Sequence, residues 1–149
     1  MDLYKLSFLL VILCVGLVQS QRNSTLVRDC SNRCTWRARC SPYYKSLVWT
    51  IVNGVCRVYQ NGCIFGSENC MRVNQCLEPM VAVDRCSSQC AAVTCPTTGP
   101  QVCGWFPYVD ANGNNKERQL TFTNRCLLNV YSCLSGEAYV GEPTQGPCQ

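Results

Sequence analysis

The longest apolar stretch of the chain lies at its N-terminus and runs from about Leu6 to Val18, behind a short head that carries a lysine. An apolar run of about a dozen residues is too short to span a bilayer, which takes roughly 20. Val18 and Ser20 occupy the two positions that signal peptidase recognises. We therefore expect residues 1–20 to be a signal peptide cut before Gln21, rather than a retained membrane anchor.

A second patterned region predicts a β-hairpin in the C-terminal half. Two segments with aromatic and β-branched residues, Trp105 to Val109 and Arg118 to Phe122, flank the turn-forming sequence Asp-Ala-Asn-Gly-Asn-Asn at 110–115. The aromatic side chains either pack on the hairpin or form an exposed binding ridge; they are Trp105, Phe106 and Tyr108. Although Asp110, Asn112 and Asn114 alternate, the ligand order of an EF-hand is not met, so we expect no calcium site.

The sequence TFTNRCLLNVYSC, residues 121–133, contains two cysteines with six residues between them. On a helix such cysteines would lie roughly 10 Å apart along the axis. That distance is too great for a bridge between them. We expect a short helix from Asn124 to about Leu134, whose two sulfurs each reach a different part of the chain. Asn124 is placed to cap this helix.

Cysteine dominates the composition. The 149 residues include 15 cysteines and no histidine, and fourteen cysteines remain once Cys14 is removed with the signal peptide. In an exported chain this density indicates disulfides. Because histidine and Cys-x-x-Cys pairs are both absent, we expect no metal or other cofactor. The lack of histidine also removes the usual general base, so we do not expect an enzyme.

The cysteines fall into two similar halves, residues 30–76 and 86–149. Each half opens on Cys-Ser-x-x-Cys, continues with a third cysteine, and later has two cysteines with six residues between them. This order indicates an internal duplication. We expect residues 21–29 to be a flexible N-terminal segment and 77–85 a linker. Each half holds an odd number of cysteines, so full oxidation requires a bridge between the halves or between two molecules.

The second half resembles the Kazal domain family. The resemblance covers residues 90–148 and rests on CPTTGPQVCG, TFTNRC and QGPC, with cysteine spacing similar to the agrin and follistatin type. It differs in Phe122, where the family prefers Tyr, and in a longer stretch between Cys103 and Cys126. The resemblance implies a small disulfide-rich α+β fold, in which each module has a short helix, a small antiparallel sheet or hairpin, and long loops. It also implies three bridges: Cys90–Cys133, Cys95–Cys126 and Cys103–Cys148.

Through the duplication, the first half is expected to be a degenerate Kazal-like module. Matching the halves implies the bridges Cys34–Cys63 and Cys40–Cys56. It places Trp49, or by strict counting Val48, where the family has its third cysteine. Gly54 falls opposite Asn124, with Asn53 one residue too early. The partners of four cysteines stay open: Cys30 would join Cys70 or Cys76, and one cysteine would join Cys86 across the linker.

Kazal domains most often inhibit serine proteases with a stiff loop between their second and third cysteines. The resemblance therefore implies a reactive loop at Cys95–Cys103 with the scissile bond Thr97–Thr98 and with Pro96 and Asn124 as loop support. Pro96 and Pro100 should stiffen this loop and Gly99 should loosen it. A small β-branched Thr favours elastase-like or subtilisin-like targets over trypsin-like ones. The equivalent residue of the first half is Pro42, and we expect no inhibition there.

The alternative function is a non-inhibitory extracellular module that binds protein or glycan. Positive charge concentrates in the first half, where Arg33, Arg37 and Arg39 lie close together. They form either a solvated face or a site for an acidic extracellular ligand. We expect a secreted, extracellular protein with no nucleic-acid partner. Asn23-Ser-Thr is a glycosylation sequon ahead of the first module.

Overall fold

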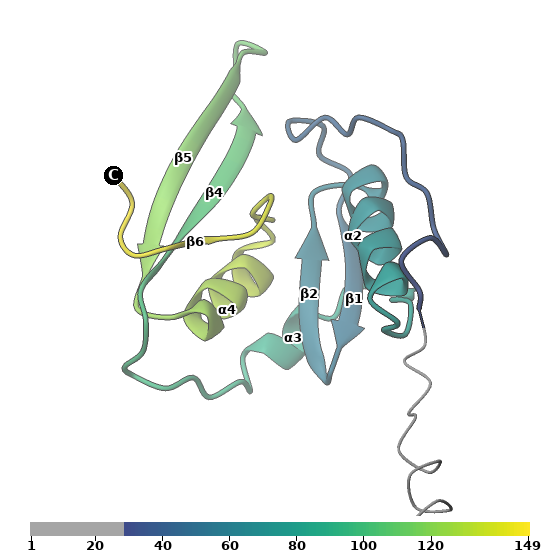
Figure 1. Ribbon diagram of the computed structural model, residues 1–149. Coiled ribbons are helices and arrows are strands. Elements are labelled where there is room, and N and C mark those ends of the chain that lie inside the picture. The colour runs from purple at the N-terminus through teal and green to yellow at the C-terminus, as the bar shows by residue number, and fades with distance from the viewer. Residues whose placement is uncertain (1–28) are drawn as a thin grey trace, which may run out of the picture.

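The structure is a computed structural model that describes residues 29–149. The expected signal peptide, nearly all of the expected N-terminal segment and the sequon at Asn23 lie outside the described residues. The fold is small, disulfide-rich and α+β, as predicted, with two antiparallel three-stranded sheets of order β2-β1-β3 and β5-β4-β6 (Figure 1). Among the described residues, no helix is long and apolar enough to cross a membrane.

The first sheet is a hairpin with a third strand added. β1 (Val48–Val52) and β2 (Val55–Tyr59) pair antiparallel through a turn at Asn53 and Gly54, which both have positive φ. Two such residues are what a tight hairpin turn requires. Helix α2 (Gly62–Asn74) follows, and β3 (Ala82–Val83) then pairs with β1. Residues 82–83, which we expected in a linker, are therefore part of the first sheet.

The second sheet repeats this order of elements after the short helix α3 (Ser87–Cys90). β4 (Val102–Val109) and β5 (Asn115–Phe122) form the second hairpin, α4 (Arg125–Ser135) follows, and β6 (Thr144–Gln145) pairs with β4. The predicted hairpin and helix are both confirmed, with longer strands than the sequence indicated. Phe106 is buried in the core, whereas Tyr108 is exposed.

Asp110 closes the second hairpin. Its Oδ1 accepts the backbone N–H groups of Asn112 and Asn114, both at 2.9 Å. The bond from Asn114 is the main reason that the pKa of Asp110 is lowered. The carboxylate is thus engaged in holding the turn, which gives this residue a structural role.

Both halves contribute to one core. A cluster of buried side chains joins the first sheet to α3 and α4, and its members are Trp49, Cys56, Val58, Cys86, Cys90, Cys133 and Ala138. A second cluster lies between the second hairpin and α4 around Val102, Phe106 and Leu128. The halves also meet where the buried side chain of Gln60 donates to the Pro107 carbonyl at 3.3 Å.

The disulfides confirm part of the expected pairing. All three bridges implied for the second half are present, namely Cys90–Cys133, Cys95–Cys126 and Cys103–Cys148. As predicted, the two cysteines of α4 bridge outward to different segments. The helix is thereby fixed at two points in addition to its packing around Leu128.

The two bridges expected within the first half are wrong. Cys34 pairs with Cys70 rather than with Cys63, and Cys40 pairs with Cys63 rather than with Cys56. The reason is that Cys56 lies on strand β2, whereas Cys63 and Cys70 lie together on α2. The cysteine pair that corresponds to Cys126 and Cys133 is therefore Cys63 and Cys70, one cysteine further along the chain.

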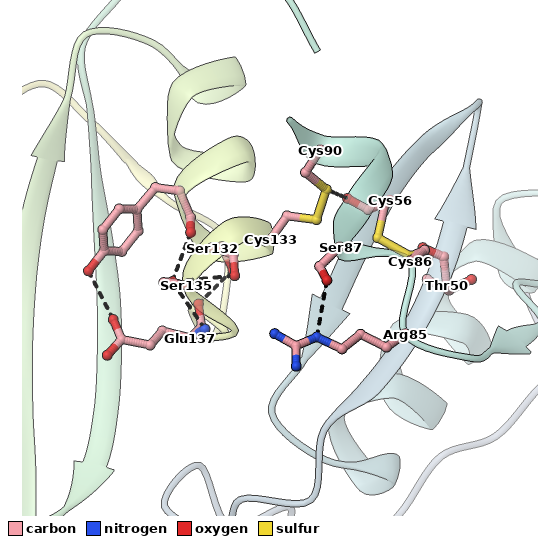
Figure 2. The surroundings of a disulfide bond; sticks show 11 residues. Thr50, Cys56, Arg85, Cys86, Ser87, Cys90, Ser132, Cys133, Ser135 and Glu137 are labelled. Carbon is pink, nitrogen blue, oxygen red and sulfur yellow. Dashed lines mark hydrogen bonds between the residues drawn. A yellow bond between two sulfur atoms is a disulfide. The ribbon is translucent and has the colours of Figure 1, made fainter. Parts of the chain in front are cut away.

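The pairings left open are resolved by two further bridges. Cys30 joins Cys76, one of the two alternatives, and Cys56 joins Cys86. The second of these ties β2 to the start of α3, so it is the expected connection across residues 77–85. Figure 2 shows it beside Cys90–Cys133, at the junction of the two halves.

Candidate functional site

The loop between Cys95 and Cys103 is the predicted reactive loop. Thr97 and Thr98 are both exposed and lie outside regular secondary structure. One end of the loop is fixed to the first turn of α4 by Cys95–Cys126. The other end is fixed by Cys103, which lies on β4 and bridges to Cys148. The loop therefore projects into solvent from two covalent anchors.

Asn124 holds the inside of this loop and caps α4 at the same time. Its Oδ1 accepts the backbone N–H of Leu127 at 3.0 Å, which is a helix cap. Its Nδ2 donates to the carbonyls of Pro96 at 2.8 Å and Thr98 at 3.3 Å. Those two carbonyls flank Thr97. A single buried side chain thus fixes the backbone on both sides of the residue expected to set specificity.

Gly99 has a different role from the one expected. Its φ is +153°, and a Cβ added there would lie 3.0 Å from the Cβ of Asn124. Any other residue would meet both backbone strain and a close contact with the supporting side chain. Gly99 therefore allows the loop to approach Asn124 closely instead of loosening it.

The first half has an equivalent asparagine, at a position that the sequence comparison missed. Asn61 caps α2 through Oδ1, which accepts the N–H of Ile64 at 3.0 Å. Its Nδ2 donates to the carbonyls of Ser41 at 2.9 Å and Tyr44 at 2.8 Å. Gly54, which we had placed opposite Asn124, belongs to the β1–β2 turn.

A sequence signal for Asn61 was present. Tyr59-Gln-Asn-Gly-Cys63 has the same order of aromatic, asparagine and cysteine as Phe122-Thr-Asn-Arg-Cys126. The choice of the wrong cysteine pair hid this match.

The first-half loop lacks a covalent anchor at its far end. Trp49 faces Val58 across the hairpin as Cys103 faces Thr121, so Trp49 occupies the strand position of the missing cysteine. The Trp49 ring is buried and has the Arg85 guanidinium 5.6 Å from its centroid. Pro42 is half-buried and lines a cleft with Trp105 of the second half. The first loop is therefore less accessible than the second.

Three sulfurs lie close together at the junction of the halves. Those of Cys56, Cys90 and Cys133 are all within 4.8 Å of one another. Each belongs to a disulfide, as Figure 2 shows, so none is a thiolate that would bind a metal ion.

The three arginines of the expected anionic-ligand site, Arg33, Arg37 and Arg39, are all exposed. They lie on the irregular segment ahead of the first sheet, on the side of α2 away from the reactive loop (Figure 1). The structure thus separates the two predicted surfaces, one in each half.

Comparison with known proteins gives no relative from which a function could be transferred: no protein-family model, curated protein or solved structure matches this chain.

Proposed function

We propose that this chain is a secreted Kazal-type serine protease inhibitor that acts through the Cys95–Cys103 loop, with Thr97–Thr98 as the scissile bond. The observation that carries the proposal is the pair of hydrogen bonds from Asn124 to the carbonyls on either side of Thr97. The seven disulfides within residues 29–149 fit an oxidising compartment such as the extracellular space.

The physical basis of the proposed inhibition is preorganisation. Binding a protease cleft orders a loop, and a loop that is already ordered by two bridges, two prolines and Asn124 loses less entropy on binding. The same restraints hold the two ends of the Thr97–Thr98 bond together if the protease cleaves it. Thr97 is small and β-branched, which suits a shallow apolar pocket of the elastase or subtilisin type.

Substitution of Thr97 tests the proposal. Thr97→Leu should shift inhibition toward chymotrypsin-like enzymes, because a buried Leu gains about 1.5–3 kcal/mol over an exposed one. That gain corresponds to about one to two powers of ten in the inhibition constant. Thr97→Arg should shift inhibition toward trypsin-like enzymes by pairing with the aspartate of their pocket. The measurement is a titration of each purified variant against elastase-, chymotrypsin-, subtilisin- and trypsin-type proteases.

Pro42→Leu is the matched control in the first half. We expect it to produce no inhibition, because Pro42 is half-buried and its loop lacks the second covalent anchor. If neither Thr97 variant inhibits any of these proteases at micromolar concentration while all bridges are native, the inhibitor proposal is wrong.

The second candidate function is a non-inhibitory extracellular module that binds protein or glycan. The exposed arginines of the first half favour it, as do two exposed aromatic side chains, Tyr44 and Tyr108. The two candidates are distinguished by the Thr97 titration, because a binding surface away from the loop would not change with residue 97.

A further inference from the structure

Residues 30–40, here called the arginine strap, lie against α2 for its whole length. They contain Arg33, Arg37 and Arg39 and run antiparallel to the helix, which Figure 1 shows as the dark blue segment beside α2. Three disulfides join the strap to the helix and the residues just after it: Cys40–Cys63, Cys34–Cys70 and Cys30–Cys76. The strap is thus fixed covalently at its start, its middle and its end.

Non-covalent contacts fix the strap between these bridges. Asn74 makes two bonds to the backbone of Cys34: its Oδ1 accepts the N–H and its Nδ2 donates to the carbonyl, both at 2.9 Å. The Trp36 ring lies directly over Gly66, where an added Cβ would be 2.6 Å from the nearest ring atom. The backbone therefore has little freedom, although it forms neither helix nor strand.

Among the described residues, no carboxylate forms an ion pair with the arginines of the strap. Within residues 29–149, the side-chain ion pairs are Arg118–Glu137 and Arg125–Glu142, and neither involves the strap. Glu68 is the acidic residue that shares a cleft with strap residues, Ala38 and Cys40. Its carboxyl interacts electrostatically with Arg57 and Arg125.

The three arginines lie within a short stretch of the chain. Arg33 and Arg39 are separated by six residues, which span at most about 20 Å. Because the screening length at physiological ionic strength is about 8 Å, a ligand that interacts with all three charges has to extend along the strap.

We propose that the arginine strap binds a sulfated polysaccharide. Arginine is the side chain best suited to such a ligand, because its planar guanidinium makes paired hydrogen bonds to an oxyanion. A polysaccharide with a sulfate on successive sugars carries a row of charges that matches a row of arginines. The fixed backbone lowers the ordering cost of the contact. This site is separate from the reactive loop and does not depend on protease inhibition.

The test measures binding of the full mature protein to a heparin-derived octasaccharide by calorimetry in physiological salt. The double variant R37Q/R39Q should bind about fivefold or more weakly, because it loses two exposed ion pairs with the ligand. The control is K45Q/K116Q, which removes the same charge from two exposed lysines outside the strap. It should change the affinity by less than about twofold, since diffuse charge acts only through screened long-range attraction.

A second variant tests the role of the fixed backbone. Trp36→Ala keeps every charge but removes the contact with Gly66, and we expect it also to weaken binding. A de-N-sulfated, de-O-sulfated octasaccharide should not bind.

Three results would overturn the proposal. The first is no binding of the wild-type protein to the sulfated octasaccharide at about 100 µM. Non-specific binding to a charged polymer has a dissociation constant of about 100 µM at its weakest, so a specific site should be detected at this concentration. The second is an equal loss in the strap and control variants, which would mean that net charge alone is responsible. The third is equal or tighter binding to vesicles of anionic phospholipid, which would assign the strap to a membrane surface.

Discussion

At the scale of single residues, Asn124 and Asn61 each satisfy two structural requirements with one side chain. The carbonyl oxygen of each caps a helix, and the amide nitrogen of each donates to two carbonyls of the loop beside it. From the sequence, helix capping and loop support were two roles open to Asn124 that did not exclude each other. The structure shows that both apply, because the amide has an acceptor and two donors that point in different directions.

Asn124→Asp should separate these two roles. Aspartate caps a helix about as well as asparagine, so the helical signal in far-UV circular dichroism should stay unchanged. The carboxylate has no N–H to donate, so the carbonyls of Pro96 and Thr98 lose their partner. We expect a loss of about 1–3 kcal/mol, measured as a weaker inhibition constant and as faster cleavage of the loop in limited proteolysis.

Asn61→Asp is the control for this substitution. It removes the same amide donor at the equivalent site of the first half. Asn61→Asp should therefore lower the unfolding temperature about as much as Asn124→Asp does, while leaving inhibition unchanged. If both variants reduced inhibition equally, the effect would come from general destabilisation and not from the reactive loop.

At the scale of elements, the second hairpin and α4 were predictable and α2 was not. α4 has an apolar face that buries Leu128. Its N-cap residue, Asn124, directly precedes the segment that holds its two cysteines, so the start of the helix can be recognised in the sequence. In α2 the one buried residue is Cys70. A helix held by disulfides instead of an apolar face has no hydrophobic periodicity for a sequence-based prediction to detect.

Cysteine spacing alone was ambiguous for the same helix. Cys56 and Cys63 have six residues between them, and so do Cys63 and Cys70. Asn61, two residues before Cys63, shows which of the two cysteine pairs lies on the helix, because an N-cap residue stands just ahead of the first helical cysteine. The capping residue was therefore a better guide to the pairing than the count of intervening residues.

Disulfide mapping checks this assignment. Digestion of the unreduced mature protein followed by mass spectrometry should yield peptides joined by Cys34–Cys70 and Cys40–Cys63, together with the homologous pairs Cys90–Cys133 and Cys95–Cys126. No free thiol should be detected. A peptide that joins Cys126 to Cys133, or Cys63 to Cys70, would contradict both helices, since residues seven apart on a helix are too far apart to bridge.

At the scale of the whole molecule, the two halves pack against each other and are joined by a disulfide. Residues 82–83 complete the first sheet, Cys56–Cys86 joins β2 to α3, and Trp49 and Val58 share a buried cluster with Cys133 of α4. From the odd cysteine counts, the sequence predicted a bridge either between the halves or between two molecules. It did not predict this packing, because the contacts join residues that are distant in sequence and have no local pattern.

The halves also share a charged cleft, and this leads to a pH-dependent prediction. Arg57 and Glu68 of the first half line it together with Arg125 and Glu142 of the second. Burial, followed by repulsion from Glu142, raises the pKa of Glu68 above 4.5. A hydrogen bond from Arg125 lowers the pKa of Glu142. The two carboxyl groups should therefore affect stability with opposite signs.

Because the pKa of Glu68 is raised in the folded state, its ionised form destabilises the fold, and this cost grows as pH rises from 4.5 through the folded-state pKa. Glu68→Gln should therefore raise the unfolding temperature at pH 7 by on the order of 2 °C, a modest value because the group is only partly shielded from solvent. The difference in unfolding temperature between Glu68→Gln and the wild-type protein should vanish below the unfolded-state pKa.

Glu142 stabilises the fold above pH 4.5, and that contribution is lost as pH falls through its lowered pKa. Glu142→Gln should accordingly lower the unfolding temperature at pH 7. Calorimetric scans of the wild-type protein and of the two variants between pH 3 and pH 7 measure both effects. If Glu68→Gln were less stable than the wild-type protein at pH 7, attraction to Arg57 and Arg125 would outweigh the cost of burying this carboxylate.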